Sequence, residues 1–446
     1  MGNIKNISML TTIGVFAICA IIAIVKIHND EIPVEPPPPF DRDFEKIAES
    51  KVLRVGLTEN VTDYCIYKAT PRGFQLETFT DFANSHNLEL DIIAVKNDAE
   101  AEKFLQDAQC DIIVKHVNQI DTSCMSCPIV HSGLVILTNT TKQNDTVFAT
   151  LEQSRNSKNL PISILSSNLS EEKIAIKVAN GEIESALCDS ALALAYQKAY
   201  PRLNIDTSLF VKQEVVWKTN PEAYVLRDSI NHWFERECGT KKFKVRRKVY
   251  YSYININVSH QLYSAKGDKI SAYDEAIKKY SKNQKWDWRF IASIIYEESH
   301  FKPNISNPSG AYGLMQLMPT GYKKFAGENA DITSPDVQLQ AGIRYITSLT
   351  KKTPATITDS AVIARYVLIG YTAGIGHAED AYNLTEKYSD TPNSWENLSK
   401  YLIALGDRKY YNDKVVKCGK YNGKRTVAFT NNIINRYKHY RNLIDN

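Results

Sequence analysis

The chain has 446 residues, more than one hydrophobic core ordinarily organises, so two or three domains are expected. With 43% hydrophobic and 23% charged residues, its composition is that of a globular protein. The formal net charge of only +4 argues against a dedicated nucleic-acid-binding protein.

The first feature in chain order is a nearly continuous apolar run from Met9 to Val25, flanked by Lys5 and Lys26. Its length is near the lower limit for a membrane span and exceeds the apolar core of most signal peptides. No small-residue cleavage site follows, so we expect residues 1–28 to form an uncleaved signal-anchor. A cleaved signal peptide is the alternative, and in either case the rest of the chain is exported.

A proline-rich stretch follows the apolar run. Four consecutive prolines at 36–39 favour an extended polyproline segment, so residues 29–47 are predicted to be a linker.

Residues 48–245 are predicted to form an α/β domain. Buried or alternating strands are expected over 51–57, 88–93 and 110–114, and helices over 73–84 and 99–106. Strands alternating with helices at this spacing are typical of a parallel sheet. Further along, 134–137 is predicted to cross into a second lobe and 181–190 to be the segment that returns.

This order of elements resembles that of the periplasmic solute-binding proteins of the amino-acid-binding type. The resemblance implies two lobes with a ligand between them, such as a muropeptide or an amino-acid-like molecule. One departure concerns residues 117–124, where the amino-acid binders carry an Arg for the ligand carboxylate and this chain has none. A working sensor with a different ligand and a purely structural domain are both left open.

Basic residues and cysteines give weaker signals. The run 241–248 is either a solvated face, a docking surface between domains or a contact with the cell wall. Seven cysteines lie outside the first apolar run, and this odd number precludes complete pairing within the chain. Cys124 and Cys127 are the one close pair, expected to be a local disulfide or two free thiols. No second pair completes a zinc site, and no metal or cofactor is predicted.

A carboxylate ends an apolar helical stripe in the next region. Asp287 is a fair N-cap, and Ile291, Ile294, Ile295 and Glu298 recur at helical spacing on one face. Burial beside apolar groups raises the pKa of a carboxyl group, and a neutral carboxylic acid can donate a proton at pH 7. The alternative is that Glu298 ends the helix in solvent.

The residues after this helix carry a specific pattern. Pro303 and the turn 307–310 precede Gly313-Leu314-Met315-Gln316. The helix ending in Glu298-Ser299 and this following stretch resemble the catalytic domain of the soluble lytic transglycosylases. The segments 336–345, 370–376 and 429–437 resemble further motifs of the same family. Thr372 departs from its usual Asn, and Asn307 from a common Ser.

The resemblance implies a mainly α, lysozyme-like domain over 265–446 that cleaves the β-1,4 bond between N-acetylmuramic acid and N-acetylglucosamine without water, leaving 1,6-anhydro ends. Glu298 would be the catalytic acid and base. The implied substrate-binding residues are Ser299, Asn307, Met315, Gln316 and Tyr371.

A two-carboxylate glycosidase would need a second acid about 5–9.5 Å from the first. The candidates are Glu328, Asp331, Asp336 and Glu379, and none lies in a family motif. A single-acid scheme is therefore expected.

A solute-binding-like domain followed by a lytic transglycosylase domain is also the arrangement of one group of membrane-bound lytic transglycosylases. The combination implies a protein of the bacterial cell envelope that faces the periplasm, is anchored by its N-terminal helix and acts on peptidoglycan glycan strands. The alternatives are a hydrolytic muramidase and a solute-binding protein with an inactive, wall-anchoring module. A balance of +7 over residues 401–446 suits either a polyanionic matrix or an ordinary solvated surface.

Overall fold

The computed structural model describes residues 41–139, 146–156, 163–284 and 286–446. The predicted signal-anchor and most of the predicted linker lie outside these ranges. Within them, no helix combines the length and apolarity that a membrane crossing requires.

The first lobe of the α/β domain follows the predicted order. Strand β1 (Val52–Thr58) pairs in parallel with β4 (Glu89–Val95) and with β5 (Ile112–Val117). The connecting helices are α3 (Phe74–Ser85) and α4 (Asp98–Gln106). The predicted strands, helices and parallel pairing are thus confirmed. A short N-terminal helix and a hairpin complete the lobe: α2 (Phe44–Ser50), β2 (Cys65–Tyr67) and β3 (Thr70–Arg72).

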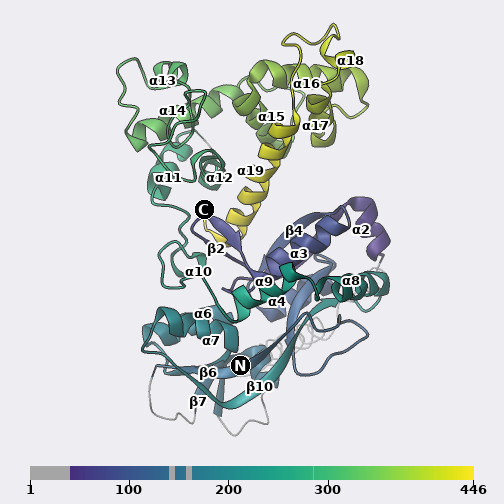
Figure 1. The fold of residues 1–446 in the computed structure, drawn as a ribbon, viewed down its shortest axis with the longest axis vertical. Coiled ribbons are helices and arrows are strands. Elements are labelled where there is room, and N and C mark those ends of the chain that lie inside the picture. Colours follow the sequence, from purple (N-terminus) through teal and green to yellow (C-terminus); the bar gives the residue numbers. More distant parts are fainter. Residues whose placement is uncertain (1–40, 140–145, 157–162, 285) are drawn as a thin grey trace, which may run out of the picture. The chain divides into compact units, whose positions relative to one another are not determined.

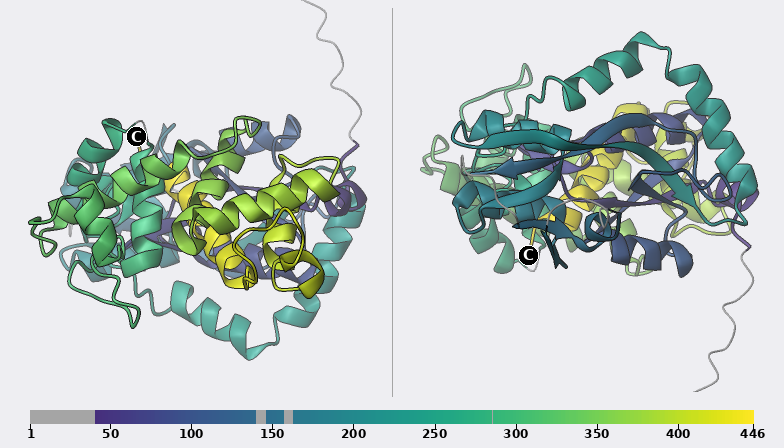
Figure 2. Two further views of the ribbon diagram at one scale, coloured as in Figure 1. Left: turned by 90° about the horizontal axis from the view of Figure 1, so that it is seen from above. Right: turned by 90° about the horizontal axis from the view of Figure 1, so that it is seen from below.

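The second lobe continues the same eight-stranded sheet, whose order is β4-β1-β5-β10-β6-β9-β7-β8. Figure 1 labels β4 of the first lobe and β6, β7 and β10 of this sheet. Its strands are β6 (Val130–Thr138), β7 (Thr146–Thr150), β8 (Ser163–Ser167), β9 (Ser185–Asp189) and β10 (Asn204–Thr219). Its helices are α5 (Leu151–Asn156), α6 (Glu171–Asn180) and α7 (Ser190–Ala199). The strands, in blue and teal, run side by side as a twisted sheet in the right-hand view of Figure 2.

Strand β10 joins the two lobes. Its last residues pair with β5, and the larger part of it pairs with β6, both antiparallel. The prediction that 181–190 returns to the first lobe was wrong. That segment forms β9, every residue of which is buried, because it lies between β6 and β7 inside the second lobe.

The core of the first lobe is aromatic. Trp217 of β10 stacks on Phe79 of α3 at 3.8 Å between ring centroids. The indole N–H of Trp217 also donates to the side-chain oxygen of Gln75 at 2.8 Å, so the buried polar group is satisfied. These contacts fix α3 against the sheet.

The basic run 241–248 belongs to helix α9 (Lys241–Tyr251), which follows α8 (Tyr224–Glu237). Lys242 and Arg246 both pair with Asp81 of α3, at 2.7 and 2.6 Å, and Arg246 also reaches Glu77 at 3.3 Å. The other basic residues of the run are exposed, as expected for a solvated face, whereas Arg246 is buried against a helix of the same α/β domain. Docking between the domains and contact with the cell wall stay predictions for this run.

The second domain consists of helices. They are α10 (Ser264–Gly267), α11 (Asp274–Lys282), α12 (Trp288–Ser299), α13 (Pro319–Phe325), α14 (Pro335–Thr350), α15 (Ser360–Ala373), α16 (Ile375–Tyr388), α17 (Trp395–Ala404), α18 (Arg408–Tyr411) and α19 (Lys424–Leu443). Helix α12 packs against α19 and α11. The predicted boundaries at 245 and 265 stay predictions.

The last helix also contacts the first lobe. The Tyr440 hydroxyl donates to the carbonyl of Ala69 at 2.7 Å, and the Asn442 amide donates to the carbonyl of Ile92 at 2.6 Å. Lys438 forms an exposed ion pair with Glu89 at 2.8 Å. Helix α19 therefore connects the helical domain to the α/β domain.

The structure shows the state of the described cysteines. Cys124 and Cys127 are free thiols, as are the other described cysteines. Of the two alternatives for this pair, the structure has the free thiols.

Candidate active site

Helix α12 places Glu298 at the end of a buried stripe, as predicted. The Asp287 side chain caps the helix by accepting from the backbone N–H of Arg289 at 2.9 Å. Ile291, Ile294 and Ile295 are completely buried. The helix ends at Ser299 because His300 adopts a left-handed conformation with φ 51°. Glu298 is partly buried, so its carboxyl group is neither in the core nor in open solvent.

The surroundings of Glu298 favour its protonated form. Burial, followed by the negative charge of Glu297, raises the pKa of Glu298 from 4.5 to about 7, while Arg425 acts in the opposite direction. In the described part of the chain, no cation forms an ion pair with Glu298. About half of the molecules therefore carry a proton there at neutral pH, as a general acid requires.

The neighbouring carboxylate has a different environment. Glu297 accepts two hydrogen bonds from Arg436 of α19, at 2.9 and 3.1 Å. The guanidinium of Arg436 also lies 3.6 Å from the ring centroid of Tyr296 and donates to the carbonyl of Ala69 at 3.1 Å. Two adjacent acids in such different environments are suited to different roles.

Ser299 joins the end of α12 to the following loop. Its hydroxyl donates to the carbonyl of Leu314 at 2.8 Å and to that of Ile295 at 3.1 Å. From the other side, Gln338 of α14 accepts from the Leu314 backbone N–H at 2.8 Å. Gly313 has φ +86°, and a Cβ there would lie 2.5 Å from the Gln338 side chain. The loop is therefore pinned between α12 and α14, and only glycine fits at 313.

The residues after Leu314 are also held through backbone contacts. Met315 is completely buried and packs against Gly342 of α14, while its carbonyl accepts from the hydroxyl of Tyr371. The Gln316 side chain donates to the carbonyls of Gly313 and Ile305 at 2.9 and 3.1 Å. These contacts fix the shape of the loop. The predicted sugar contacts of Met315 and Gln316 stay predictions.

Two other residues singled out by the sequence lie at the surface. Asn307 is exposed, and its side-chain oxygen accepts from the backbone N–H groups of Ser309 and Ala311 at 2.9 and 3.0 Å, which organises the turn. Thr372 is exposed at the C-terminal end of α15, and its hydroxyl donates to the carbonyl of Leu368. A sugar contact of Asn307 stays a prediction.

Tyr371 is the predicted residue whose link to the acid is visible. Burial and then the charge of Glu298 raise the pKa of Tyr371 far above its ordinary value. None of the four candidate second carboxylates is among the charges acting on Glu298. Three of them have other partners: Glu328 pairs with Lys323, Asp331 accepts from Thr333, and Asp336 accepts from Tyr280.

The sequence reasoning missed Arg425, Arg436 and Gln338 as parts of this site. Arg436 is the counter-ion of Glu297, and Gln338 holds the loop. Gln338 lies in the segment 336–345, whose resemblance to a family motif was the signal that could have found it. Nothing in the local sequence pairs α19 with α12.

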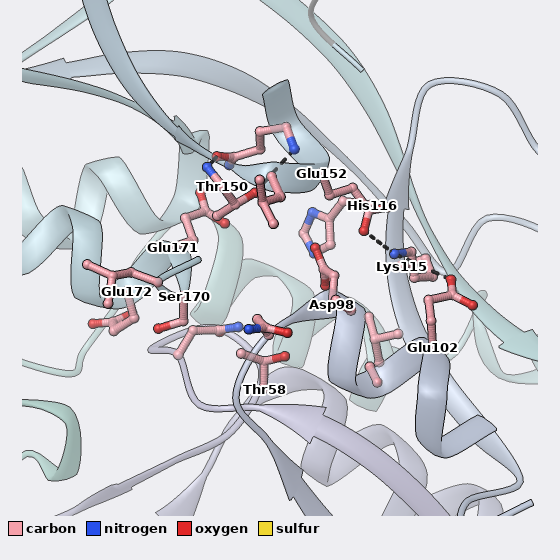
Figure 3. A pocket seen from close by; sticks show the side chains of 18 of the residues that line it. Thr58, Asp98, Glu102, Lys115, His116, Thr150, Glu152, Ser170, Glu171 and Glu172 are labelled. Carbon is pink, nitrogen blue, oxygen red and sulfur yellow. Dashed lines mark hydrogen bonds and ion pairs between the residues drawn. The ribbon is translucent and has the colours of Figure 1, made fainter. Parts of the chain in front are cut away.

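A separate cavity of about 610 Å³ lies between the lobes of the first domain (Figure 3). The close-up shows Asp98, Glu152 and Glu171 around the same space, together with Lys115 and His116. The cavity lies where the resemblance to solute-binding proteins implies a ligand.

Known proteins resemble the chain in both parts. Residues 275–393 match the family model described as "Transglycosylase SLT domain". A membrane-bound lytic murein transglycosylase F from Desulfosudis oleivorans is 26% identical, over 88% of this chain and 90% of the relative. Proteins of the same name from Shewanella sediminis and Vibrio parahaemolyticus are 24% and 26% identical, over 97% and 90% of this chain and 91% and 83% of theirs.

Solved structures resemble the α/β part. A mutant ArgBP from T. maritima has a TM-score of 0.41 and 19% identity, covering 47% of this chain and 98% of its own. The VFT2 domain of Bordetella pertussis BvgS has a TM-score of 0.40 and 17% identity, covering 48% of this chain and 100% of its own.

In this chain a two-lobed α/β domain therefore precedes a segment that matches the transglycosylase SLT domain, and over most of its length the chain is similar to proteins named membrane-bound lytic murein transglycosylase F.

Proposed function

We propose that this protein is a peptidoglycan lytic transglycosylase that cleaves the bond between N-acetylmuramic acid and N-acetylglucosamine and leaves 1,6-anhydro ends. The observation that carries the proposal is the partly buried Glu298, whose pKa is raised to about 7 at the end of the helix that opens the SLT motif. The SLT match and the names of the relatives support the same reaction.

Glu298 acts twice in this reaction. In its neutral form it protonates the glycosidic oxygen while positive charge develops at the anomeric carbon of the muramic acid residue. As a carboxylate it then takes the proton of the C6 hydroxyl of the same sugar as that oxygen attacks the anomeric carbon. General acid and base help of this kind contributes roughly 10²–10⁴-fold to the rate.

The surroundings of Glu298 support a scheme with one acid. The carboxylate nearest in sequence, Glu297, is bonded to Arg436. Among the residues that the structure describes, the charges acting on Glu298 are those of Glu297 and Arg425, and neither is a free second acid that could activate water as in an inverting glycosidase. Hydrolysis by a muramidase is thereby disfavoured.

Ser299, Met315 and Tyr371 are proposed as positioning residues for the loop that follows the catalytic helix. The basis is their hydrogen bonds to loop carbonyls and the packing of Met315 on α14. Gln316 and Asn307 are proposed to present this loop and the adjoining turn to the glycan strand, since both are at least partly exposed.

The first domain is proposed to bind a small ligand and to influence the catalytic domain. Two contacts connect them at the catalytic helix. The Thr70 hydroxyl lies 2.9 Å from the hydroxyl of Tyr296, and Arg436 bonds both Ala69 and Glu297. Ala69 and Thr70 belong to the β2–β3 hairpin, so a movement of that hairpin would reach the residues next to Glu298.

The protein is further proposed to act at the periplasmic side of the bacterial envelope, anchored through residues 1–28. The apolar run of that segment and the words "membrane-bound" in the names of the relatives support this location.

Digestion of purified sacculi, with mass spectrometry of the products, tests the reaction. We expect anhydro-muramyl ends, which are lighter by one water than the ends that hydrolysis leaves. Reducing ends would instead identify a muramidase. No release from sacculi would identify a solute-binding protein with an inactive module.

A further inference from the structure

The cavity between the lobes of the first domain is lined by acids. The described lining residues include Glu59, Asp63, Asp98, Glu102, Glu152, Glu171 and Glu172. The cationic side chains among the described lining residues are Lys115 and His116, and no described arginine lines the cavity.

Both cations of the lining are already engaged. Lys115 forms ion pairs with Glu152 and with Glu102, the latter at 3.6 Å. His116 lies 3.5 Å from Asp189 and 3.9 Å from Asp63. Neither is left over for the carboxylate of an amino acid, for which an unpaired cation would be needed.

The helix ends at the cavity are also unsuited to an anion. An exposed helix N-terminus attracts negative charge. At α4 the first turn carries Asp98, and at α6 it carries Glu171 and Glu172. Asn97 and Ser170 cap these two helices through their own side chains. The chain thus fills both anion positions with its own carboxylates.

The two cations do not balance the acids of the lining. Asp63 is 5% exposed, and its Oδ1 has no hydrogen-bond partner within the described residues. Asp98 comes from the first lobe and Glu152 from the second, yet they are close enough that Asp98 helps to raise the pKa of Glu152, after burial. Burial, and then the charge of Asp189, raise the pKa of Glu171 to about 8. A buried carboxylate needs a cation or a proton to be stable.

The spacing of these acids favours an organic cation over a metal ion. Within the part of the chain that the structure describes, the one group of His, Cys, Asp or Glu able to share an ion is His377, Asp380 and Cys418, in the second domain. The cavity, at about 610 Å³, holds a molecule of several carbon atoms, and its acids come from both lobes. Amino groups at two positions of one chain would neutralise acids of both lobes.

We propose that the cavity between the lobes binds a di- or polyamine that carries no carboxylate group. Acids of opposite lobes then close on a cation, and the missing carboxylate-binding arginine is not needed. The inference rests on the proposed ligand-binding function of this domain and is independent of glycan cleavage.

Matched ligands test the chemistry directly. Cadaverine and lysine differ only by the carboxylate, as do agmatine and arginine. With full-length protein, isothermal titration calorimetry is expected to show each amine binding about tenfold or more tightly than its amino acid, since burying an unpaired carboxylate among acids costs at least that factor. Spermidine is expected to bind as well.

Variants locate the site. Glu171→Gln and Asp98→Asn should each weaken cadaverine binding about fivefold or more, whereas Glu182→Gln, an exposed residue of the same lobe paired with Lys177, should not. Circular dichroism and a cooperative thermal unfolding transition would establish that the variants are folded.

Equal or tighter binding of the amino acids would overturn the inference and leave the sensor proposal standing. Binding of none of the probes would overturn the inference and leave the sensor proposal to ligands of other chemistry, such as muropeptides, while the lytic reaction is measured separately. Amine binding unaffected by Glu171→Gln and Asp98→Asn would place the ligand elsewhere and also refute the assignment.

Discussion

Replacing Glu298 with Gln is expected to abolish lytic activity and, at alkaline pH, to make the protein more stable. The amide is close in size to the carboxyl group but can neither donate a proton as an acid nor accept one as a base. At pH 7 a pKa of about 7 leaves about half of the carboxyl groups protonated, against roughly 0.3% at 4.5. The expected loss of activity is on the order of 10²–10⁴-fold.

The stability effect follows from the raised pKa. The folded state holds the Glu298 proton more tightly than the unfolded state. The stability that this proton contributes is therefore complete below pH 4.5 and is lost as the pH rises from 4.5 through 7. The difference in the pKa of Glu298 between the folded and unfolded states corresponds to at most about 3 kcal/mol of stability. Solvent screening reduces this value at a partly buried site. Gln carries no such cost.

The assay compares Tm values of the variant and the parent protein at pH 5 and pH 8, with muropeptide release from sacculi measured on the same samples. We expect the variant to gain in Tm relative to the parent between the two pH values. A Tm difference that does not change with pH would refute the argument that Glu298 is a buried, protonated acid. Full activity of the variant would refute its catalytic role.

Three further perturbations test the surroundings of this acid. Glu297→Gln removes the negative charge that helps to raise the pKa of Glu298. The alkaline limb of the pH–rate profile should therefore move to lower pH while activity persists. A shift to higher pH would contradict the electrostatic argument. Ser299→Ala removes the hydroxyl that donates to the Leu314 carbonyl and should lower the free energy of unfolding, measured in urea, by roughly 1–3 kcal/mol. An unchanged unfolding midpoint would show that the loop does not depend on this hydrogen bond. Gly342→Ala places a Cβ about 2.2 Å from the Met315 sulfur and should lower stability by roughly 1–3 kcal/mol, with partial recovery in the double variant with Met315→Ala. Equal stability of Gly342→Ala and the parent would mean that the loop carrying Met315 moves away from α14 without cost.

Local sequence patterns were sufficient to predict the elements that position Glu298, the proposed catalytic acid. The Asp287 cap, the isoleucine stripe and the place of Glu298 at its end are short-range features that depend on helical geometry alone. The strands and helices of the first lobe followed from hydrophobic alternation for the same reason. The strand order of the second lobe did not, because 181–190 forms a buried strand whose neighbours come from distant parts of the chain.

The tertiary structure was needed to explain why Glu298, and not the adjacent Glu297, can hold a proton. Helix geometry alone puts Glu297 about 100° around the helix from Glu298, but only the fold brings Arg436, 139 residues away in the chain, against Glu297. Similarly, the sequence showed that a carboxylate-binding arginine is missing from the first domain. The acidic cavity that occupies its place is assembled from α4, α5 and α6 of two lobes. Charge interactions depend on distance in space, and chain order does not contain that distance.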